Sequence, residues 1–391
     1  MNSTICLDYL ILAMVKNNKN IRLCLVLTEG MSFQLWDEYG LLYREIALYR
    51  ELINHGVHTT FVSFGNSDEL KYKNSLSEFE IIYNKWGLSN SLYIKFINLL
   101  NFKKLKNIDI VKTNQIESIN TATNIAKFWG IPILGRMGYL KSFQKKKLHG
   151  VDSQLYCDAI MLEKKLAVKS SKIILTTNQL KESFESSYPE SHNKIIVIPN
   201  FVDTTLFKPD YNIEKKYDLL YIGRLAEQKN IKILLKAVIG LKLKILFIGK
   251  GPFKINILKY KKKYNLNLEL IDMVPNQDLP VYLNSASIFI LPSSFEGNPK
   301  SLLEAMSCEM PVIGANSPGI SNMISHNNNG FICDSTIDGI REAINDLVNK
   351  VELQNKLSKN ARLYILENYS LDLIVKKELG LYDEIIHHEK Y

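Results

Sequence analysis

Thirteen short runs rich in Ile, Leu and Val recur along the chain, and longer helix-like stretches separate them. This alternation is typical of β-strands joined by crossover helices in a parallel sheet that is buried on both faces. The runs form two series, and each series would build one sheet. The first series comprises 21–27, 58–64, 79–83, 108–111, 131–134, 172–177 and 194–199. The second series comprises 217–223, 243–249, 268–274, 287–293, 311–315 and 330–333.

A segment without a helical period separates the two series. It reads PNFVDTTLFKPDYN over residues 199–212, and its prolines argue against a continuous helix or strand. A chain of 391 residues, 46% of them hydrophobic, can bury two cores, so length also favours two domains. We therefore predict an α/β fold with two doubly wound, Rossmann-like domains, 1–199 and 200–370, that face each other across a cleft. The amphipathic C-terminal stretch 371–391 is predicted to pack back on the first domain.

The formal net charge of +9 suggests an anionic partner, which would be nucleic acid, a nucleotide-type substrate or an acidic membrane face. The alternative is that a composition rich in Lys and Asn inflates the count. The five cysteines form no CxxC pair and no zinc site, so we expect reduced thiols in the cytosol. The apolar segment ICLDYLILAMV (5–15) is too short for a membrane span and lacks the flanks of a signal peptide.

Two strands of the second series end in glycine-bearing loops. Gly223, Arg224 and Lys229 follow the first of these strands. A glycine at a strand end permits close backbone approach, and two cations beside a helix N-terminus suit a diphosphate. The alternative for the two cations is a solvated surface turn. The next strand ends in Gly249 and Gly251, whose backbone would border the same cleft because parallel strands end at one sheet edge.

The stretch SSFEGNPKSLLEAMS (293–307) has a glutamate on each side of a predicted helix start. Glu296 lies in the loop, Asn298 is predicted to cap the helix, and Pro299 is predicted to occupy its first position. Free N–H groups in the first turn would favour a phosphate or a sugar oxygen. These groups belong to Lys300, Ser301 and Leu302. Glu304 lies two turns in, and its carboxylate suits a pair of vicinal hydroxyls; the alternative is that both glutamates are surface residues.

Four motifs occur in a fixed order, namely VIPNFVDTTLFKP, GRLAEQKN, IGKGP and FEGNPKSLLEAMSCEMPVIG. In this order and at these loop positions they resemble the motifs of glycosyltransferase family 4, whose members are retaining enzymes with the GT-B fold. The resemblance is clear from about residue 195 to 335 and weaker before that. It implies that the second domain binds a nucleotide-sugar donor and that the first domain supplies the acceptor site.

The resemblance also implies roles for the motif residues. Glu304 would bind the nucleotide ribose, and Glu296 would contact hydroxyls of the donor sugar. Arg224 and Lys229 would hold the diphosphate and stabilise its charge as it leaves. Val274 would meet the base through its main chain. Phosphate and sugar would be held by backbone groups of Asn298, Pro299, Lys300, Ser301 and Leu302.

No D-x-D motif occurs in the chain, so the usual carboxylate pair for a metal–diphosphate bridge is missing. Fixed cations and a helix N-terminus aimed at the leaving oxygen can stabilise its charge without a metal. We therefore expect metal-independent transfer and no cofactor.

The N-terminal half carries weaker signals. WDEYGLLYREIALYREL (36–52) is predicted to form one amphipathic helix, and Gly30 before it is predicted to permit close backbone approach. Many members of the family that this chain resembles carry a histidine in the loop after a middle strand of the first domain. At that place this chain has Arg136 and Tyr139. Arg136 is predicted to contact the donor phosphates or an acidic acceptor. The alternative is a cation that only caps a strand end.

A group of lysines lies near aromatic residues in the first domain. The lysines are Lys141, Lys145, Lys146 and Lys147, beside Tyr139 and Phe143, with further ones at Lys103, Lys104 and Lys106. Such a patch predicts docking on anionic lipid, which suits an enzyme that extends a lipid-linked glycan. The alternative is a solvated charge run.

These observations favour a retaining glycosyltransferase that uses a nucleotide diphosphate sugar, with UDP as the expected nucleotide. A glycan or a lipid-linked molecule would be the acceptor, in the synthesis of capsule, O-antigen or lipopolysaccharide. We expect a cytoplasmic protein, peripheral on the inner face of the cell membrane. The alternatives are a nucleotide-sugar epimerase on the same fold and a basic nucleic-acid-binding protein. No nucleic-acid reader motif occurs, so nucleic acid is not an expected partner.

Overall fold

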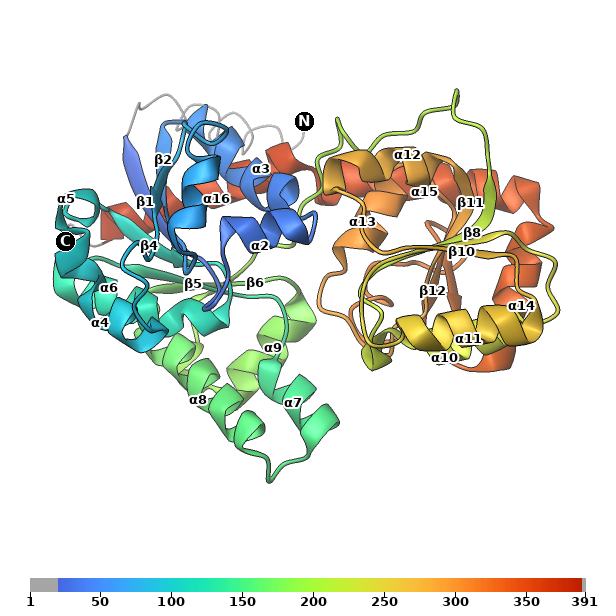
Figure 1. Cartoon of the computed structure of the whole chain (residues 1–391), viewed down its shortest axis with the longest axis horizontal. Helices are drawn as coiled ribbons and strands as arrows, with labels where there is room; N and C mark the ends of the chain where they lie inside the picture. Colours follow the sequence, from blue (N-terminus) through green and yellow to red (C-terminus); the bar gives the residue numbers. More distant parts are fainter. Residues whose placement is uncertain (1–19, 389–391) are drawn as a thin grey trace, which may run out of the picture.

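The computed structural model describes residues 20–388, in which the chain folds around two parallel sheets (Figure 1). All thirteen predicted strands are confirmed, and so is the α/β architecture of two Rossmann-like units. The apolar segment 5–15 and the last three residues of the predicted C-terminal helix lie outside the described residues.

The first sheet has seven strands in the order β3-β2-β1-β4-β5-β6-β7, all parallel. The strands are β1 (Ile21–Val26), β2 (Val57–Val62), β3 (Glu80–Ile82), β4 (Ile110–Thr113), β5 (Ile133–Met137), β6 (Lys172–Leu175) and β7 (Ile195–Val197). The helices are α2 (Phe33–Glu38), α3 (Leu42–Ile53), α4 (Asn90–Leu100), α5 (Phe102–Leu105), α6 (Ile119–Trp129), α7 (Lys141–His149), α8 (Gln154–Lys169) and α9 (Asn178–Ser187).

The second sheet has six parallel strands in the order β10-β9-β8-β11-β12-β13. The strands are β8 (Tyr217–Ile222), β9 (Ile245–Ile248), β10 (Leu268–Ile271), β11 (Ala286–Leu291), β12 (Val312–Ala315) and β13 (Phe331–Cys333). The helices are α10 (Ile231–Ala237), α11 (Lys254–Tyr264), α12 (Leu279–Asn284), α13 (Lys300–Ser307), α14 (Ile337–Val348), α15 (Val351–Asn368) and α16 (Leu371–His388). Short 3₁₀ turns are η1 (Ser67–Tyr72), η2 (Ile116–Ser118), η3 (Pro189–Ser191), η4 (Glu227–Lys229) and η5 (Asn276–Asp278).

The first sheet is buried on both faces. Leu23 and Leu25 of β1 point into one core, whereas Cys24 and Val26 point into the other, because successive side chains of a strand alternate between faces. This burial explains why the strand reads as a continuous apolar run rather than as an alternating one.

The last helix, α16, packs on the first domain although it follows the second in sequence (Figure 1). Ile374 and Tyr382 of α16 lie in the same core as the start of β1. A buried ion pair joins the helix to the sheet, with Lys112 Nζ of β4 2.5 Å from Glu378 Oε2. Loss of either partner would leave a buried, unpaired charge, so this pair holds α16 in place.

The chain crosses between the domains twice, and the two crossings lie side by side. Val202 N donates to Tyr369 O at 2.9 Å, and Leu371 N donates to Val202 O at 3.0 Å. Both sheets turn the carboxyl ends of their strands toward the space between the domains, which is where such folds bind ligands. No helix within residues 20–388 combines the length and the apolar character needed to cross a membrane.

Candidate active site

A cavity of about 950 Å³ lies between the two domains. Its walls come from loops that follow β1, β4 and β5 in the first domain and β8, β9, β10 and β11 in the second. Most predicted site residues line it, namely Gly223, Arg224, Lys229, Gly249, Gly251, Val274, Glu296, Asn298, Pro299, Lys300, Ser301, Glu304 and Tyr139. Gly30, Arg136 and Leu302 are not among the lining residues.

Glu296 and Lys229 form an ion pair in this cavity, between Oε1 and Nζ. The Glu296 side chain is only 9% exposed and that of Lys229 17%. Their two loops are also joined next to the pair, because Gln228 Nε2 donates to Phe295 O and Ser294 N donates to Gln228 O, each at 2.9 Å. The sequence therefore folds the loops after β8 and β11 into one rigid wall.

The glycine loops after β8 and β9 pack directly on each other. A Cβ atom on Gly249 would lie 1.9 Å from Gly223 O, so no other residue fits there without moving the backbone. This contact brings the loop of Arg224 against the loop of Lys250 and Gly251, at the end of the cavity next to Lys229. Position 249 therefore requires a glycine because the two loops pack so closely there.

The start of α13 differs from the prediction. The helix begins at Lys300 with Pro299 at its N-cap, and no side chain caps it. Asn298 instead binds the crossing segment, since its Oδ1 accepts from Asn200 N at 2.9 Å and its carbonyl accepts from Asn200 Nδ2 at 2.6 Å. The prediction that Asn298 caps α13 is wrong because this long-range partner takes its side chain.

The first turn of α13 also has fewer free donors than predicted. The N–H groups of Leu302 and Leu303 donate to Pro299 O, at 3.2 and 3.3 Å. Leu302 has its side chain in the core, so only its main chain could meet a ligand, and that contact stays a prediction. The N–H groups of Lys300 and Ser301 are the ones that the helix start presents to the cavity.

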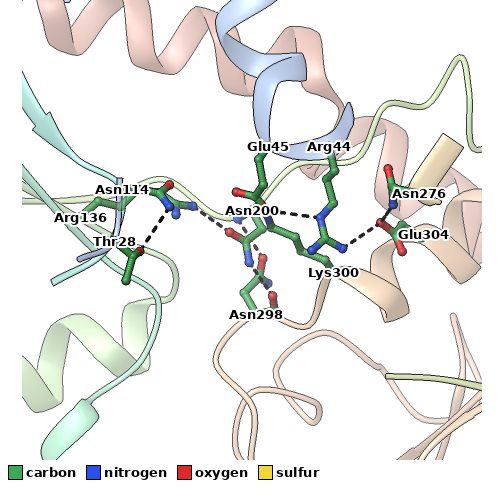
Figure 2. A network of polar contacts seen from close by, with 10 residues as sticks. All are labelled: Thr28, Arg44, Glu45, Asn114, Arg136, Asn200, Asn276, Asn298, Lys300 and Glu304. Carbon is green, nitrogen blue, oxygen red and sulfur yellow. Dashed lines mark hydrogen bonds and ion pairs between the residues drawn. The ribbon is translucent and has the colours of Figure 1, made fainter. Parts of the chain in front are cut away.

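Glu304 is buried one turn further along α13, with its side chain 3% exposed. Asn276 Nδ2 of η5 donates to Glu304 Oε1 at 2.8 Å, and Arg44 Nη1 of α3 lies 3.5 Å from the same oxygen (Figure 2). Burial raises the pKa of Glu304, whereas Arg44, Asn276 and Lys300 lower it. No role was predicted for Arg44 or Asn276, because their partner lies far away along the chain.

A second ion pair crosses between the domains beside this one. Lys300 Nζ lies 2.7 Å from Glu45 Oε1, the residue next to Arg44 in α3 (Figure 2). Burial lowers the pKa of Lys300 to about 8, although Glu45 opposes that effect. Burial alone would raise the pKa of Glu45, but Lys300 and Arg44 lower it to about 2. The pair is therefore charged around neutral pH.

The predicted helix over 36–52 is broken. Gly40, with φ of +67°, separates α2 from α3, and Asn276 N donates to Gly40 O at 2.9 Å. A Cβ atom on Gly40 would lie 2.9 Å from both Met273 Sδ and Val274 O. The close backbone approach that was predicted for Gly30 is therefore found at Gly40, since a Cβ on Gly30 would meet nothing within 4 Å.

Arg136 lies inside β5 rather than in the loop after it. Its Nη2 donates to Asn200 Oδ1 at 2.8 Å, so it binds the crossing segment and does not line the cavity (Figure 2). Arg136 lies in the strand because β5 extends three residues further than the apolar run, and its contact with phosphate or acceptor stays a prediction. Tyr139, in the loop beyond, does line the cavity.

A smaller, mostly apolar pocket of about 160 Å³ adjoins Glu296. Its walls include Leu140, Phe143 and Leu180 of the first domain and Phe295 and Pro318 of the second. Phe143 and Phe295 meet edge to face with ring centroids 5.7 Å apart. Within residues 20–387, no three His, Cys, Asp or Glu side chains are grouped so that they could hold a metal ion.

Comparison with known families gives two matches that together cover most of the chain. Residues 46–206 match the family described as Glycosyltransferase Family 4, and residues 203–364 match the family described as Glycosyl transferases group 1. The two matches meet at the segment where the chain crosses between its domains.

Individual relatives are distant. An uncharacterized glycosyltransferase of Haemophilus influenzae is 30% identical over 231 residues, which are 56% of this chain and 64% of that protein, just under two thirds. The UDP-Gal:alpha-D-GlcNAc-diphosphoundecaprenol alpha-1,3-galactosyltransferase of Escherichia coli is 27% identical over 312 residues, covering 74% of this chain and 79% of the relative. Among solved structures, a sucrose-phosphate synthase from Thermosynechococcus elongatus superposes with a TM-score of 0.76 at 16% identity, covering 94% of this chain and all of that one.

Proposed function

The chain belongs to glycosyltransferase family 4 and has the GT-B fold, and from this premise we propose that it moves a sugar from a UDP-sugar to a glycan or lipid-linked acceptor. Relatives support a place in the synthesis of polysaccharides or lipid-linked glycans. We further propose that the product keeps the anomeric configuration of the donor and becomes part of a capsule, O-antigen or lipopolysaccharide.

The observation that supports this proposal best is the ion pair of Lys229 with Glu296 in the cavity that Arg224 and the start of α13 also line. A diphosphate that leaves a sugar gains negative charge, and fixed cations with free helix N–H groups stabilise that charge. A carboxylate next to those cations is placed to accept hydrogen bonds from the hydroxyls of the sugar.

The proposed step breaks the bond between the sugar C1 and the diphosphate oxygen and forms a bond from C1 to an acceptor oxygen on the same face. The acceptor proton passes to the leaving diphosphate, so no histidine is required. Arg224 and Lys229 supply the positive charge, and the proposal therefore includes transfer without a metal or a cofactor. Glu304 would hold the ribose and the main chain at Val274 the base.

We propose that the acceptor carries a lipid. The apolar pocket beside Glu296 and the lysines of α7 offer an apolar surface next to positive charge, which fits an amphiphile with an anionic head. The E. coli relative is named for transfer to a diphosphoundecaprenol-linked sugar. The enzyme would then work at the inner face of the cell membrane, bound from the cytoplasm.

The test is incubation of the protein with a panel of UDP-sugars and a lipid extract, followed by mass spectrometry of the products and measurement of free UDP. We expect one UDP-sugar to yield UDP and an acceptor heavier by one sugar, and Glu296→Ala to abolish both. A changed sugar that is still attached to UDP would identify an epimerase instead. Tight, salt-sensitive binding of DNA or RNA without any UDP-sugar turnover would favour the nucleic-acid alternative.

A further inference from the structure

Arg44 belongs to the first domain, yet its guanidinium lies against a carboxylate of the second. The contact is between Arg44 Nη1 and Glu304 Oε1, at 3.5 Å, and Asn276 Nδ2 donates to the same oxygen at 2.8 Å (Figure 2). Arg44 is itself held from the other side by Glu45, whose Oε1 lies 3.4 Å from Arg44 Nε. The guanidinium is therefore fixed between two carboxylates.

Both contacts of Glu304 use Oε1, which leaves Oε2 to accept hydrogen bonds from a ligand. A carboxylate held through one oxygen has a fixed plane, so its second oxygen points in a defined direction. Arg44, Asn276 and Glu304 all line the large cavity together with Val274. The end of the cavity that would hold a nucleoside is thus built from both domains.

Charged, titratable and polar groups surround Glu304, and they come from several elements. Arg44 and Tyr43 approach from α3, Asn276 from η5 and Asp203 from the crossing segment. Lys300 approaches from the same helix as Glu304, and Cys308 follows directly after that helix. Burial raises the pKa of Glu304, and Arg44 has the largest effect among the groups that lower this pKa. Without Arg44 the carboxylate would be protonated at a higher pH than in the intact protein.

We propose that Arg44 is a positioning residue for the donor nucleotide, which acts by fixing the carboxylate of Glu304 so that it binds the ribose hydroxyls. This inference rests on the proposed function, since it assumes that the cavity binds a nucleotide. It means that nucleotide affinity depends on the two domains being closed against each other. A donor site confined to the second domain would not respond to a change in α3.

The test is calorimetric binding of UDP to the full-length protein and to Arg44→Gln, Arg44→Lys and Arg50→Gln at pH 8 and pH 6. Arg50 is the matched control, because it lies in the same helix and pairs at the surface with Glu78. We expect Arg44→Gln to bind UDP about 10-fold more weakly at pH 8, as for a lost hydrogen bond to a charged group. Its deficit should grow as the pH falls, because loss of Arg44 raises the pKa of Glu304 further. Arg44→Lys should recover part of the affinity.

The outcomes separate this inference from the proposed function. If the wild type binds UDP and Arg44→Gln binds it equally well at both pH values, Arg44 has no positioning role. Tighter binding by Arg44→Gln would also overturn the inference, because Arg44 would then compete with the ribose for Glu304. If the wild type binds none of UDP, ADP and GDP, the proposed function fails and this inference fails with it. Thermal unfolding of each variant identifies any loss that is due to misfolding.

Discussion

Glu296 and Glu304 are two carboxylates in one cavity, and each is held through a single oxygen. Lys229 pairs with Oε1 of Glu296, whereas Asn276 and Arg44 hold Oε1 of Glu304. A carboxylate fixed in this way keeps its other oxygen available for a hydroxyl of the ligand. Their surroundings therefore suit two separate contacts with one extended donor.

Lys229→Met should lower kcat about 10²- to 10³-fold, the usual effect of removing one group that stabilises developing negative charge. Methionine keeps most of the volume of the lysine, so the packing of the two loops should persist although Glu296 loses its partner. The measurement is the rate of UDP release at saturating donor.

Lys232→Met is the control for this prediction, because Lys232 is exposed on α10, three residues further along the chain. It should leave the rate of UDP release unchanged. A rate for Lys229→Met within threefold of the wild type would mean that Lys229 does not stabilise the leaving group.

At the level of elements, the start of α3 and the start of α13 form one unit across the domain boundary. Two adjacent residues of α3, Arg44 and Glu45, meet Glu304 and Lys300, which lie one turn apart on α13. Residues four apart on a helix share a face, so both pairs form on the same side of α13. The turn at Gly40 extends this contact to the loop of Val274.

Gly40→Ala should disturb this unit, whereas Gly30→Ala should not. Gly40 has a φ of +67° and Gly30 a φ of +83°. Both substitutions therefore force alanine into the left-handed backbone region at a similar cost in free energy. Only at Gly40 does the added Cβ also approach Val274 O at 2.9 Å. We expect Gly40→Ala to lower the free energy of unfolding by about 1–3 kcal/mol more than Gly30→Ala, the usual range for overpacking.

Chemical denaturation of both variants measures that difference, and the KM for the UDP-sugar gives a second readout. The KM should rise for Gly40→Ala alone, because the contact beside Val274 would open. Equal effects of the two substitutions on both quantities would show that the approach of Gly40 to the second domain has no consequence.

The strands were predictable because each one is a local apolar run, and the loops that carry Arg224, Lys229 and Glu296 follow directly from strand order. The contacts that were not predicted have a different origin. Asn298 and Arg136 both bind Asn200, a partner that neither local pattern nor spacing identifies. The same holds for Arg44, whose contact with Glu304 joins residues 260 positions apart. Local periodicity thus predicted the sheets and the loop positions, but not the contacts between domains.

For the molecule as a whole, the positive charge is concentrated in one stretch. Residues 92–169 carry thirteen Lys and one Arg against five Asp and Glu, so this fifth of the chain alone has the formal charge of +9. Of the 23 large apolar side chains exposed between residues 20 and 388, twelve lie in 92–168. A composition that merely inflated the count would spread both features evenly, so the concentration argues against that explanation, although Lys112 of this stretch is buried and paired with Glu378.

The helix α7 is the part of this stretch where a membrane contact can be tested most directly. It projects with α8 from the lower side of the first domain in Figure 1, and none of its residues is buried. Its lysines Lys145, Lys146 and Lys147 accompany Phe143 and Leu148, which are 49% and 44% exposed. Basic and apolar side chains on one exposed helix suit the headgroup region of an anionic bilayer.

Replacing these three lysines by glutamine should weaken binding to vesicles that contain an anionic phospholipid by about 100-fold, since each lysine near such a surface contributes about 1 kcal/mol. The matched control replaces Lys261, Lys262 and Lys263 of α11, which are also three in number and are all exposed, but which lie on the second domain. Co-sedimentation with vesicles measures both, and binding of the wild type should fall as salt shortens the range of the attraction. Equal losses from the two triple variants would mean that total charge, rather than the face that includes α7, governs membrane binding.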